Sequence, residues 1–261
     1  MPNVLALMCH PDDIEFTCAG LLILLRKAGW DVHLATMTAG DLGSSTLAPA
    51  EISKVRKGEA AAAAALIDAS YTCLEFRDLT VVYGEETKRP ASAVLRQVRP
   101  DLLVTLNPSD YMEDHTETSR IAREAAFTST VPHWKAALAD GSEPAPCDHL
   151  PPVLYADPID NVDHFGDRVR PHFVVDITDV IDTKEQMLAC HESQRSWLRQ
   201  QHGEDEYLNW MRRTARDRAR DFGKKSVTYA EGFIQHRGNA FPREDPLTPA
   251  LGDARVKTLR P

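Results

Sequence analysis

Two short stretches of the chain combine histidine with aspartate in a pattern that could hold a metal ion. The apolar run VLALM ends in CHPDD at residues 9–13, and a second stretch, NPSDYMEDH, ends in Asp114-His115. Adjacent carboxylates repel each other, so a positive partner is expected beside the aspartates of the first stretch. His-x-x-Asp from one loop and a histidine from another supply nitrogen and oxygen ligands for a divalent metal, zinc first, with one position open for water.

The two aspartates of the first stretch take different roles in this interpretation. His10, Asp13 and His115 are the expected metal ligands, and iron(II) or another divalent ion is the alternative to zinc. Asp12 then stays free beside the metal, where it could accept a proton from water whose pKa the metal has lowered towards ~7. The pattern therefore predicts a catalytic metal centre with Asp12 as the general base.

The same carboxylates also fit a purely structural role. Asp12 or Asp13 could cap a helix that begins near Ile14, and Asp114 with Glu117 could form a capping pair. However, both clusters follow strands that the order of the elements predicts to be neighbours. Two unrelated structural roles at adjacent strand ends would be a coincidence, so a shared functional site is the better explanation.

Strand and helix patterns alternate through the first half of the chain. Helices are expected at 14–28, 51–67, 87–98 and 116–127, between strands at 4–9, 31–37, 71–76 and 101–106. This alternation predicts an α/β, Rossmann-like doubly wound, mostly parallel sheet with helices on both faces and an irregular C-terminal elaboration. In such a sheet the first strand lies between the second and the fourth, and ligands bind at the carboxyl ends of the first and fourth strands. The two histidine–aspartate clusters follow those two ends.

The second half of the chain is less regular. Residues 138–152 are rich in proline, aspartate and glycine and are expected to form a loop or internal boundary, and the last twenty residues are expected to run over the surface or into a neighbouring subunit. We expect one domain over 1–261, with a metal-binding core at 1–135 and a substrate-pocket and oligomerisation elaboration at 136–261. Its elements are predicted at 153–156 and 171–176 (strands) and at 183–201 and 205–222 (helices).

Composition excludes some classes of protein. The 261 residues are 43% hydrophobic, which is enough for a sizeable core, but no apolar run approaches the ~20 residues of a membrane span and no secretion signal is evident. Five scattered cysteines form no Cys-x-x-Cys pair, which favours a reduced, cytoplasmic protein. The net charge of −9 argues against a nucleic-acid partner, and the basic segment 212–225 is expected to be a solvated helix face.

Several motifs resemble, in order, those of the PIG-L/LmbE-like family of N-acetylglucosaminyl deacetylases. HPDD with the following Glu15 and Gly20 is similar to the family's signature, which begins A-H-P-D-D. The other similar segments are TAGDLG (38–43, the T-x-G-E-x-G loop), Arg56-x-x-Glu59, Asp114-His115 (the end of H-P-D-H) and the late helix with His191-x-Ser193-Gln194. The similarity covers about the first 130 residues and fades afterwards.

This resemblance implies a zinc-dependent hydrolase that removes an N-acetyl group from an N-acetylglucosamine-type sugar or glycoside. By position, the three expected ligands and Asp12 match the family's metal ligands and general base. Arg56 matches a substrate-contacting arginine, and Asp114 matches the carboxylate that supports a neighbouring histidine.

One residue departs from the family pattern. Met112 stands where the H-P-D-H motif begins with a histidine that assists at the oxyanion or the leaving amine. Methionine can do neither, so either the metal alone polarises the carbonyl or another donor enters the site. Tyr111, His133 and His191 are the candidates.

Arg56, Asp41 and Tyr111 are the expected substrate-binding residues. Arg56 could instead form an exposed i,i+3 pair with Glu59, and Asp41 could either line the pocket or form a turn.

Other functions stay open at this point. One is a non-catalytic or differently catalytic sugar- or nucleotide-binding Rossmann-like protein, and another is an amidase that acts on a thiol-glycoside conjugate. A dinucleotide-dependent reductase is disfavoured because two carboxylates after the first strand would repel a phosphate. The expected partner is a small N-acetylated sugar, without nucleic acid or membrane, and the chain could form a homo-oligomer.

Overall fold

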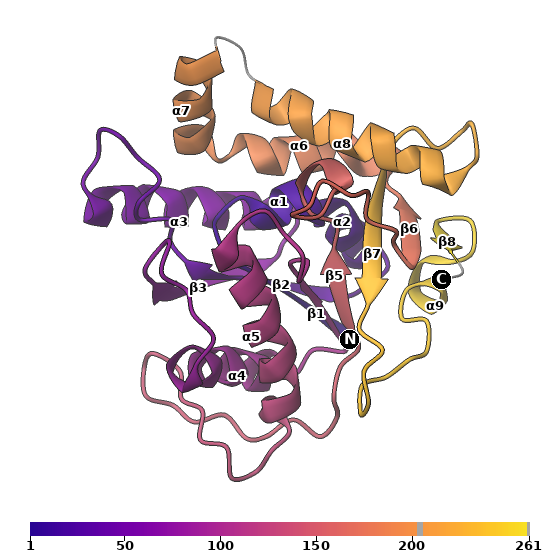
Figure 1. Cartoon of the computed structure of the whole chain (residues 1–261). Helices are drawn as coiled ribbons and strands as arrows, with labels where there is room; N and C mark the ends of the chain where they lie inside the picture. Colours follow the sequence, from indigo (N-terminus) through magenta and orange to yellow (C-terminus); the bar gives the residue numbers. More distant parts are fainter. Residues whose placement is uncertain (203–205, 260–261) are drawn as a thin grey trace.

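One mixed sheet organises the molecule. The structure is a computed structural model and describes residues 1–202 and 206–259. Its strands lie in the order β3-β2-β1-β4-β5-β7-β6-β8 (Figure 1). The strands are β1 (Asn3–Met8), β2 (Asp31–Thr38), β3 (Ser70–Phe76), β4 (Leu102–Thr105), β5 (Val153–Ala156), β6 (Phe173–Asp176), β7 (Ala230–Gln235) and β8 (Val256–Thr258).

Helices cover both faces of this sheet, as the alternating pattern predicts. Helices α4 and α5 pack on each other and on β1 from one face, while α2, α3, α6 and α8 lie on the other (Figure 1). The helices are α1 (Asp13–Thr17), α2 (Ala19–Lys27), α3 (Pro49–Ala65), α4 (Glu85–Val98), α5 (Glu113–Ser129), α6 (Ile181–Ala189), α7 (Glu192–His202), α8 (Glu206–Phe222) and α9 (Thr248–Leu251), with short 3₁₀ turns η1 (Ile159–Asn161) and η2 (Thr178–Val180). Within the described ranges, every helix is too short or too polar to cross a membrane.

The parallel half of the sheet creates the predicted switch point. Strand β1 pairs in parallel with β2 on one side and with β4 on the other, and β2 and β4 continue in parallel to β3 and β5. Residues 4–8 of β1 are fully buried, because helices cover both faces of this central strand. The carboxyl ends of β1 and β4 are therefore neighbours, which confirms the predicted doubly wound fold.

The helix expected at 14–28 is interrupted at Cys18, which separates α1 from α2. The buried Glu231 carboxylate explains the interruption, because it accepts the first free N–H groups of α2, from Gly20 (2.8 Å) and Leu21 (2.7 Å). Lys184 neutralises this carboxylate at 2.6 Å. A Cβ on Gly20 would lie 2.7 Å from Glu231 Oε1, so the close approach requires glycine at this position.

The second half of the chain extends the same sheet with antiparallel strands. Strand β7 pairs with β5 and β6, and β8 pairs with β6. Neither β7 nor β8 is predicted from the sequence, and the end of the chain returns to the sheet edge rather than only running over the surface. The helix expected at 183–201 is divided into α6 and α7 at residues 190–191, and Asp205, the expected start of the next helix, lies outside the described residues.

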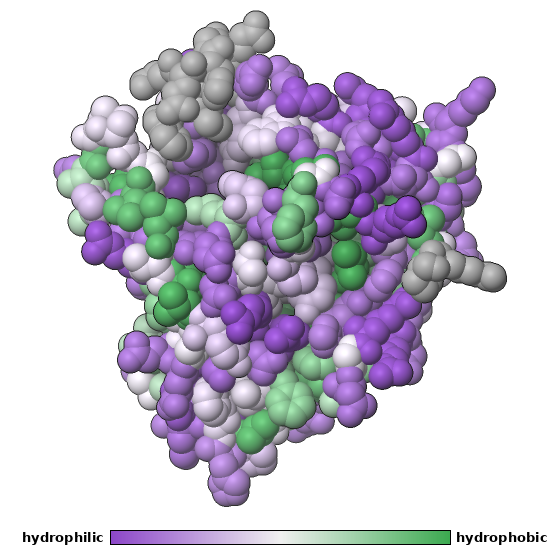
Figure 2. Space-filling model, in the orientation of Figure 1, coloured by the Kyte–Doolittle hydropathy of each residue, from purple (hydrophilic) through white to green (hydrophobic). Residues whose placement is uncertain are grey.

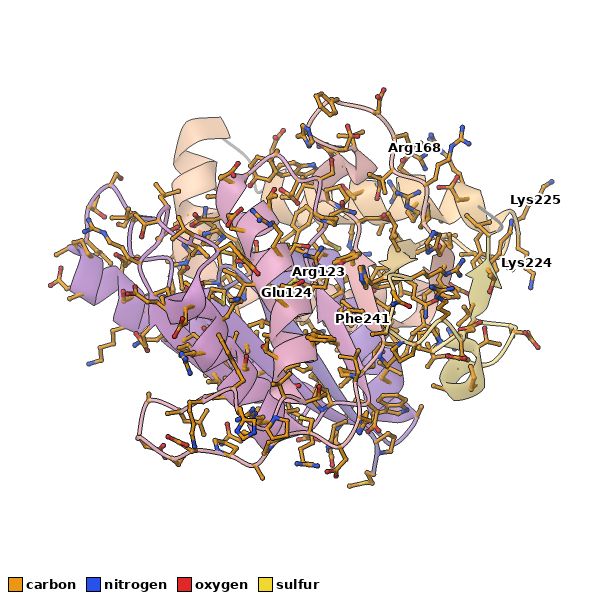
Figure 3. The ribbon with its side chains drawn as sticks, turned by 60° about the horizontal axis from the view of Figure 1, so that its bottom comes forward. Arg123, Glu124, Arg168, Lys224, Lys225 and Phe241 are labelled. Atoms are coloured by element: carbon orange, nitrogen blue, oxygen red, sulfur yellow. The ribbon has the colours of Figure 1, made fainter. Side chains whose placement is uncertain are left out.

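The basic segment 212–225 is only partly a solvated face. Lys224 and Lys225 are exposed and project from the outer edge of the molecule beyond α8 (Figure 3). Arg218, in contrast, is 1% exposed, and it pairs with Asp157 (2.6 Å) and Asp221 (2.7 Å). The expectation of a uniformly solvated face is therefore wrong at Arg218, which ties α8 to the loop after β5.

Candidate metal centre

The two neighbouring strand ends bring the three expected ligands together. His10 follows β1, Asp13 begins α1, and His115 lies in the first turn of α5. His10 Nδ1 lies 3.2 Å from His115 Nε2, and the Asp13 carboxylate oxygens lie 3.5 Å and 3.4 Å from these two nitrogens. Metal bonds of about 2.1 Å in a tetrahedral site separate neighbouring ligand atoms by about 3.4 Å. The spacing of the three donors therefore fits zinc or an ion of similar size.

Two buried carboxylates orient the imidazole rings. Asp78 Oδ1 lies 2.9 Å from His10 Nε2, and Asp110 Oδ1 lies 2.9 Å from His115 Nδ1. Each carboxylate accepts the N–H of its ring, so the hydrogen-bond network assigns the lone pairs to His10 Nδ1 and His115 Nε2. Two lone pairs that face each other at 3.2 Å repel unless a cation or a proton lies between them, which is the chemistry of a metal site.

The electrostatics of the site favour a positive charge at its centre. Burial opposes the charged imidazolium of His115, but Asp13 and Asp110 outweigh it and raise the pKa of His115 to about 10. Burial likewise disfavours the Asp13 carboxylate, yet His115 and His10 hold the pKa of Asp13 well below its usual range.

A second group of potential ligands, Cys9, His10 and Asp114, shares the His10 ring. Burial raises the pKa of the Cys9 thiol, which keeps it protonated, and metals bind the thiolate. His10 Nε2, the ring nitrogen nearest to Asp114 at 3.6 Å, is already bonded to Asp78. The set of His10, Asp13 and His115 is therefore the better metal site.

Asp12 is buried beside this centre but is separate from the three donors. It has a left-handed backbone (φ 105°) before α1, and its side chain makes no capping hydrogen bond. The helix-capping alternative for Asp12 is therefore wrong. Burial raises the pKa of Asp12, while Arg56, whose Nη2 lies 3.4 Å from Oδ2, opposes that rise. Such a carboxylate has a higher proton affinity than an exposed aspartate, as a general base requires.

Arg56 holds the backbone around Asp12. It is 4% exposed and donates to the carbonyl oxygens of Pro11 (2.7 Å) and Gly40 (3.3 Å). Gly40 has φ 64°, and a Cβ there would lie 2.2 Å from Arg56 Nη1, so only glycine admits the guanidinium. Glu59 does not pair with Arg56 and instead accepts hydrogen bonds from Ser193, so the exposed-pair alternative is wrong.

Asp114 anchors the loop that follows β3. Its carboxylate accepts the backbone N–H groups of Leu79 (2.7 Å) and Val81 (3.2 Å), and Glu117 accepts that of Tyr83. These two acidic residues therefore do not form a capping pair for α5. A catalytic role for Asp114 stays a prediction, and its contacts in the structure are to this loop and to His10.

The expected substrate-binding residues lie around the same edge of the sheet. Asp41 is half-buried and accepts the backbone N–H of Asp78 at 2.8 Å, so it supports a turn. Tyr111 is 65% exposed, and its ring centroid lies 5.5 Å from that of His115. Met112 is half-buried beside Tyr111. Direct substrate contact by Arg56, Asp41 and Tyr111 stays a prediction.

The candidates for the missing proton donor are far apart. His133 is exposed and follows α5 at the end opposite to His115, away from the centre. His191 is fully buried, 3.2 Å from Glu15, whose carboxylate outweighs burial and raises the pKa of His191. Asp12 also interacts electrostatically with His191 and with Tyr207 of α8.

Sequence reasoning missed Asp78, Asp110 and Tyr207 as residues of this site. Asp78 is two residues beyond β3 and Asp110 five residues before His115, so each follows a strand at the carboxyl edge. That position is the signal that could have identified these two aspartates. No comparable signal exists for Tyr207, which reaches Asp12 from α8.

Together, His10, Asp13 and His115 form a buried candidate metal site of three protein donors, with the Asp12 carboxylate beside it. Residues 5–126 match the PIG-L family, described as GlcNAc-PI de-N-acetylase. This match spans the segment that carries the motifs and confirms the resemblance over residues 5–126. Its relatives include both hydrolytic and hydratase enzymes.

The similarity of this chain to two relatives extends beyond residues 5–126. The chain is 24% identical over 259 residues to 4-oxalmesaconate hydratase of Pseudomonas putida, which covers 92% of this chain and 90% of that protein. It is 26% identical over 199 residues to diacetylchitobiose deacetylase of Thermococcus kodakarensis, which covers 74% of this chain and 70% of that one.

Solved structures share the fold. The 4-carboxy-2-hydroxymuconate hydratase GalB of Pseudomonas putida has a TM-score of 0.76 at 23% identity and covers 94% of this chain and 98% of its own. N,N'-diacetylchitobiose deacetylase of Pyrococcus horikoshii has a TM-score of 0.74 at 24% identity, with 90% and 83% covered. A zinc-inhibited teicoplanin deacetylase has a TM-score of 0.65 at 16% identity, with 91% and 99% covered.

Proposed function

We propose that the protein is a zinc-dependent amide hydrolase that removes the N-acetyl group of an N-acetylglucosamine-type sugar or glycoside. The observation that carries this proposal is the different placement of two adjacent aspartates: Asp13 faces both histidines, whereas Asp12 is buried outside the donor set and pairs with Arg56. A centre that only bound a metal for stability would have no use for a second carboxylate outside the donor set.

The donors that would hold the metal are His10, Asp13 and His115. When bound, a divalent ion lowers the pKa of water and polarises the amide carbonyl. The residues around it do the remaining work. Asp12 accepts a proton from the attacking water as its oxygen bonds to the carbonyl carbon. When the C–N bond breaks, Asp12 returns this proton to the leaving nitrogen, and acetate and the amine are the products.

Arg56 maintains the geometry of this transfer. It binds the Pro11 and Gly40 carbonyl oxygens and so connects the turn that carries Asp12 to the loop after β2. Its proximity to Asp12 also limits how far burial raises the carboxyl pKa. This opposition by Arg56 favours the ionised form of Asp12, which is the form that a general base requires.

The test is the substitution Asp12→Asn, which keeps the shape of the side chain and removes its basicity. We expect turnover to fall by about 10²–10⁴-fold while the bound metal is retained. Acetate and free amine from N-acetylated glucosides would be measured with the metal content of the same sample. Asp253→Asn, at an exposed position, is the matched control. Normal turnover by Asp12→Asn with full metal content would refute the assigned base.

A hydratase is the second candidate function, and Met112 is the observation that favours it. Adding water to a carbon–carbon double bond releases no amine, so such an enzyme has no need of the histidine that Met112 replaces. The charges argue in the other direction, because Asp12, Asp78 and Asp114 around the centre would repel a substrate that carries several carboxylates. Loss of the conjugated absorbance of 4-carboxy-2-hydroxymuconate, with no acetate release from any N-acetylated sugar, would establish the hydratase instead.

A further inference from the structure

Exposed apolar side chains lie on the loops that follow the parallel strands, at the same edge of the sheet as the metal ligands. Leu42 follows β2 and is 37% exposed, Leu79 and Val82 follow β3 and are 60% and 64% exposed, Tyr111 follows β4 (65%), and Phe165 follows β5 (79%). The four loops that carry them all leave the carboxyl edge of the parallel strands. We call these five residues the apolar collar. Figure 2 shows apolar surface in green among the mostly hydrophilic side chains of the face seen in Figure 1.

Two collar residues form backbone hydrogen bonds with carboxylates that lie beside the metal ligand His10. Asp114 accepts the backbone N–H of Leu79, and Asp78 accepts that of Leu42 at 3.4 Å. Both carboxylates lie within 3.6 Å of His10 Nε2. The Tyr111 ring lies edge-on to His115, so the collar begins directly outside the metal centre.

The fourth loop reaches the same place through a side-chain contact. His164 Nδ1 lies 2.8 Å from Ser109 Oγ, and Ser109 is two residues from Tyr111 in sequence. The His164 ring also contacts that of Phe165, with centroids 3.9 Å apart and the ring planes tilted by 47°. Through His164, the loop that carries Phe165 therefore contacts the loop that carries Tyr111.

The backbone at Leu79 adds a second, independent observation. Leu79 has φ 60°, a left-handed conformation that costs a non-glycine residue about 1 kcal/mol or more. The Asp114 carboxylate accepts hydrogen bonds from the backbone N–H groups of Leu79 and Val81 and so maintains this conformation, and the result is a leucine held in solvent beside the metal centre. Strain and exposed apolar surface both disfavour this arrangement in the free protein, and a bound apolar group would compensate for the exposure.

We propose that the collar binds an apolar aglycone, alkyl or aryl, attached to the amino sugar whose amide is hydrolysed. This proposal rests on the proposed deacetylase function and adds the substrate class. The acetyl group must reach the buried centre, where His10, Asp13 and His115 are at most 8% exposed. The exposed collar then meets the opposite end of the substrate, beyond the sugar ring.

The size of the collar also favours a small ligand over a second copy of the chain. Together these five side chains expose on the order of 500 Å² of apolar surface, spread over four loops. A stable protein interface needs about 800 Å² from each partner.

The experiment compares glycosides that differ only in the aglycone. Methyl, hexyl and phenyl N-acetyl-β-glucosaminides would be assayed for amine release with the zinc-loaded protein. We expect kcat/KM for the hexyl and phenyl glycosides to exceed that for the methyl glycoside by about tenfold or more, since each buried methylene strengthens binding. Calorimetry with the deacetylated hexyl and methyl products should show the same order of affinity without any catalytic step.

Leu79→Asn is the informative variant, because asparagine tolerates a left-handed backbone and removes the apolar side chain. We expect it to reduce the hexyl-to-methyl ratio of kcat/KM towards one. Leu66→Asn, a leucine of similar type that is 48% exposed at the end of α3, is the matched control and should leave the ratio unchanged.

Several results would refute the proposal that the collar binds the aglycone. Equal kcat/KM for methyl and hexyl glycosides would refute it while leaving the proposed deacetylase intact. A preference for longer N-acyl chains in place of larger aglycones would reverse the orientation and also refute it. A dimer in light scattering that Leu79→Asn dissociates would show that a second copy occupies the collar. Failure to deacetylate any of the glycosides would instead refute the proposed function itself.

Discussion

The contact between Asp110 and His115 gives the sharpest test of the metal centre. Asp110 is 5% exposed, and its Oδ1 lies 2.9 Å from His115 Nδ1. Asp110→Asn keeps an oxygen that can accept the ring N–H but removes the negative charge. His115 should then be a weaker donor, because the carboxylate that increases its basicity is gone.

The expected magnitude follows from comparable sites. Loss of a carboxylate that orients a metal-bound histidine lowers metal affinity by about 10–100-fold, which is about 1.4–2.7 kcal/mol at 25 °C. The lower end applies if the oxygen of the new amide stays where the carboxylate oxygen was. The upper end applies if the amide turns its NH₂ group towards the ring and the His115 tautomer changes.

The assay is competition for zinc between the protein and a coloured chelator at fixed pH, with no substrate present. Asp140→Asn is the control, since Asp140 lies in an exposed turn and bonds only to Ser142 among the described residues. Zinc affinity equal to that of the unmodified protein, with an unchanged fold by circular dichroism, would refute the ligand role of His115. Weaker zinc binding by both variants would show a general charge effect instead.

Two further predictions concern the buried contacts between the start of α2, Lys184 and Glu231. Gly20→Ala should lower the free energy of unfolding by about 1–3 kcal/mol, since a Cβ there would lie 2.6 Å from Ile177 Cγ2. Gly58→Ala is the control: open space surrounds Gly58, so this substitution should stabilise helix α3 by about 0.5–1 kcal/mol. Thermal melting of both variants measures the difference, and equal destabilisation would contradict the close approach. Lys184→Met should cost about 3–5 kcal/mol because it leaves the buried Glu231 carboxylate without its cation. The double variant Lys184→Met with Glu231→Gln should recover part of this loss in urea unfolding, and a purely additive result would contradict the coupling.

Much of the first half of the molecule is determined by local sequence. The buried run before His10 can only be a central strand, and the alternation of strands and helices leads to the order β3-β2-β1-β4. That order alone makes the ends of β1 and β4 neighbours, so the strand pattern pairs His10 with His115 across 105 positions. The elements involved have strong periodicity and short connections, which is where sequence patterns are most informative.

The elements of the second half could not be predicted from local sequence in the same way, for physical reasons. Strand β7 contains Glu231 and Gly232, which are poor strand formers, and it is recruited because its Glu231 neutralises Lys184 and caps α2. The break between α6 and α7 likewise depends on His191, which is fully buried against Glu15 from the other end of the chain. Neither interaction changes the local pattern of apolar and polar residues, so that pattern cannot predict it.

By itself, the sequence determined the residue types and the strand ends that could form a metal site, since both follow from neighbours in the chain. Only the tertiary structure decided which carboxylates orient the ligands, that Arg56 is buried against the Asp12 turn, and that Asp114 anchors a loop. The reason is that a side chain's chemistry depends on its distance to charges and on its burial. Both are set by segments that are remote in sequence, and their approach emerges only when the whole sheet is assembled.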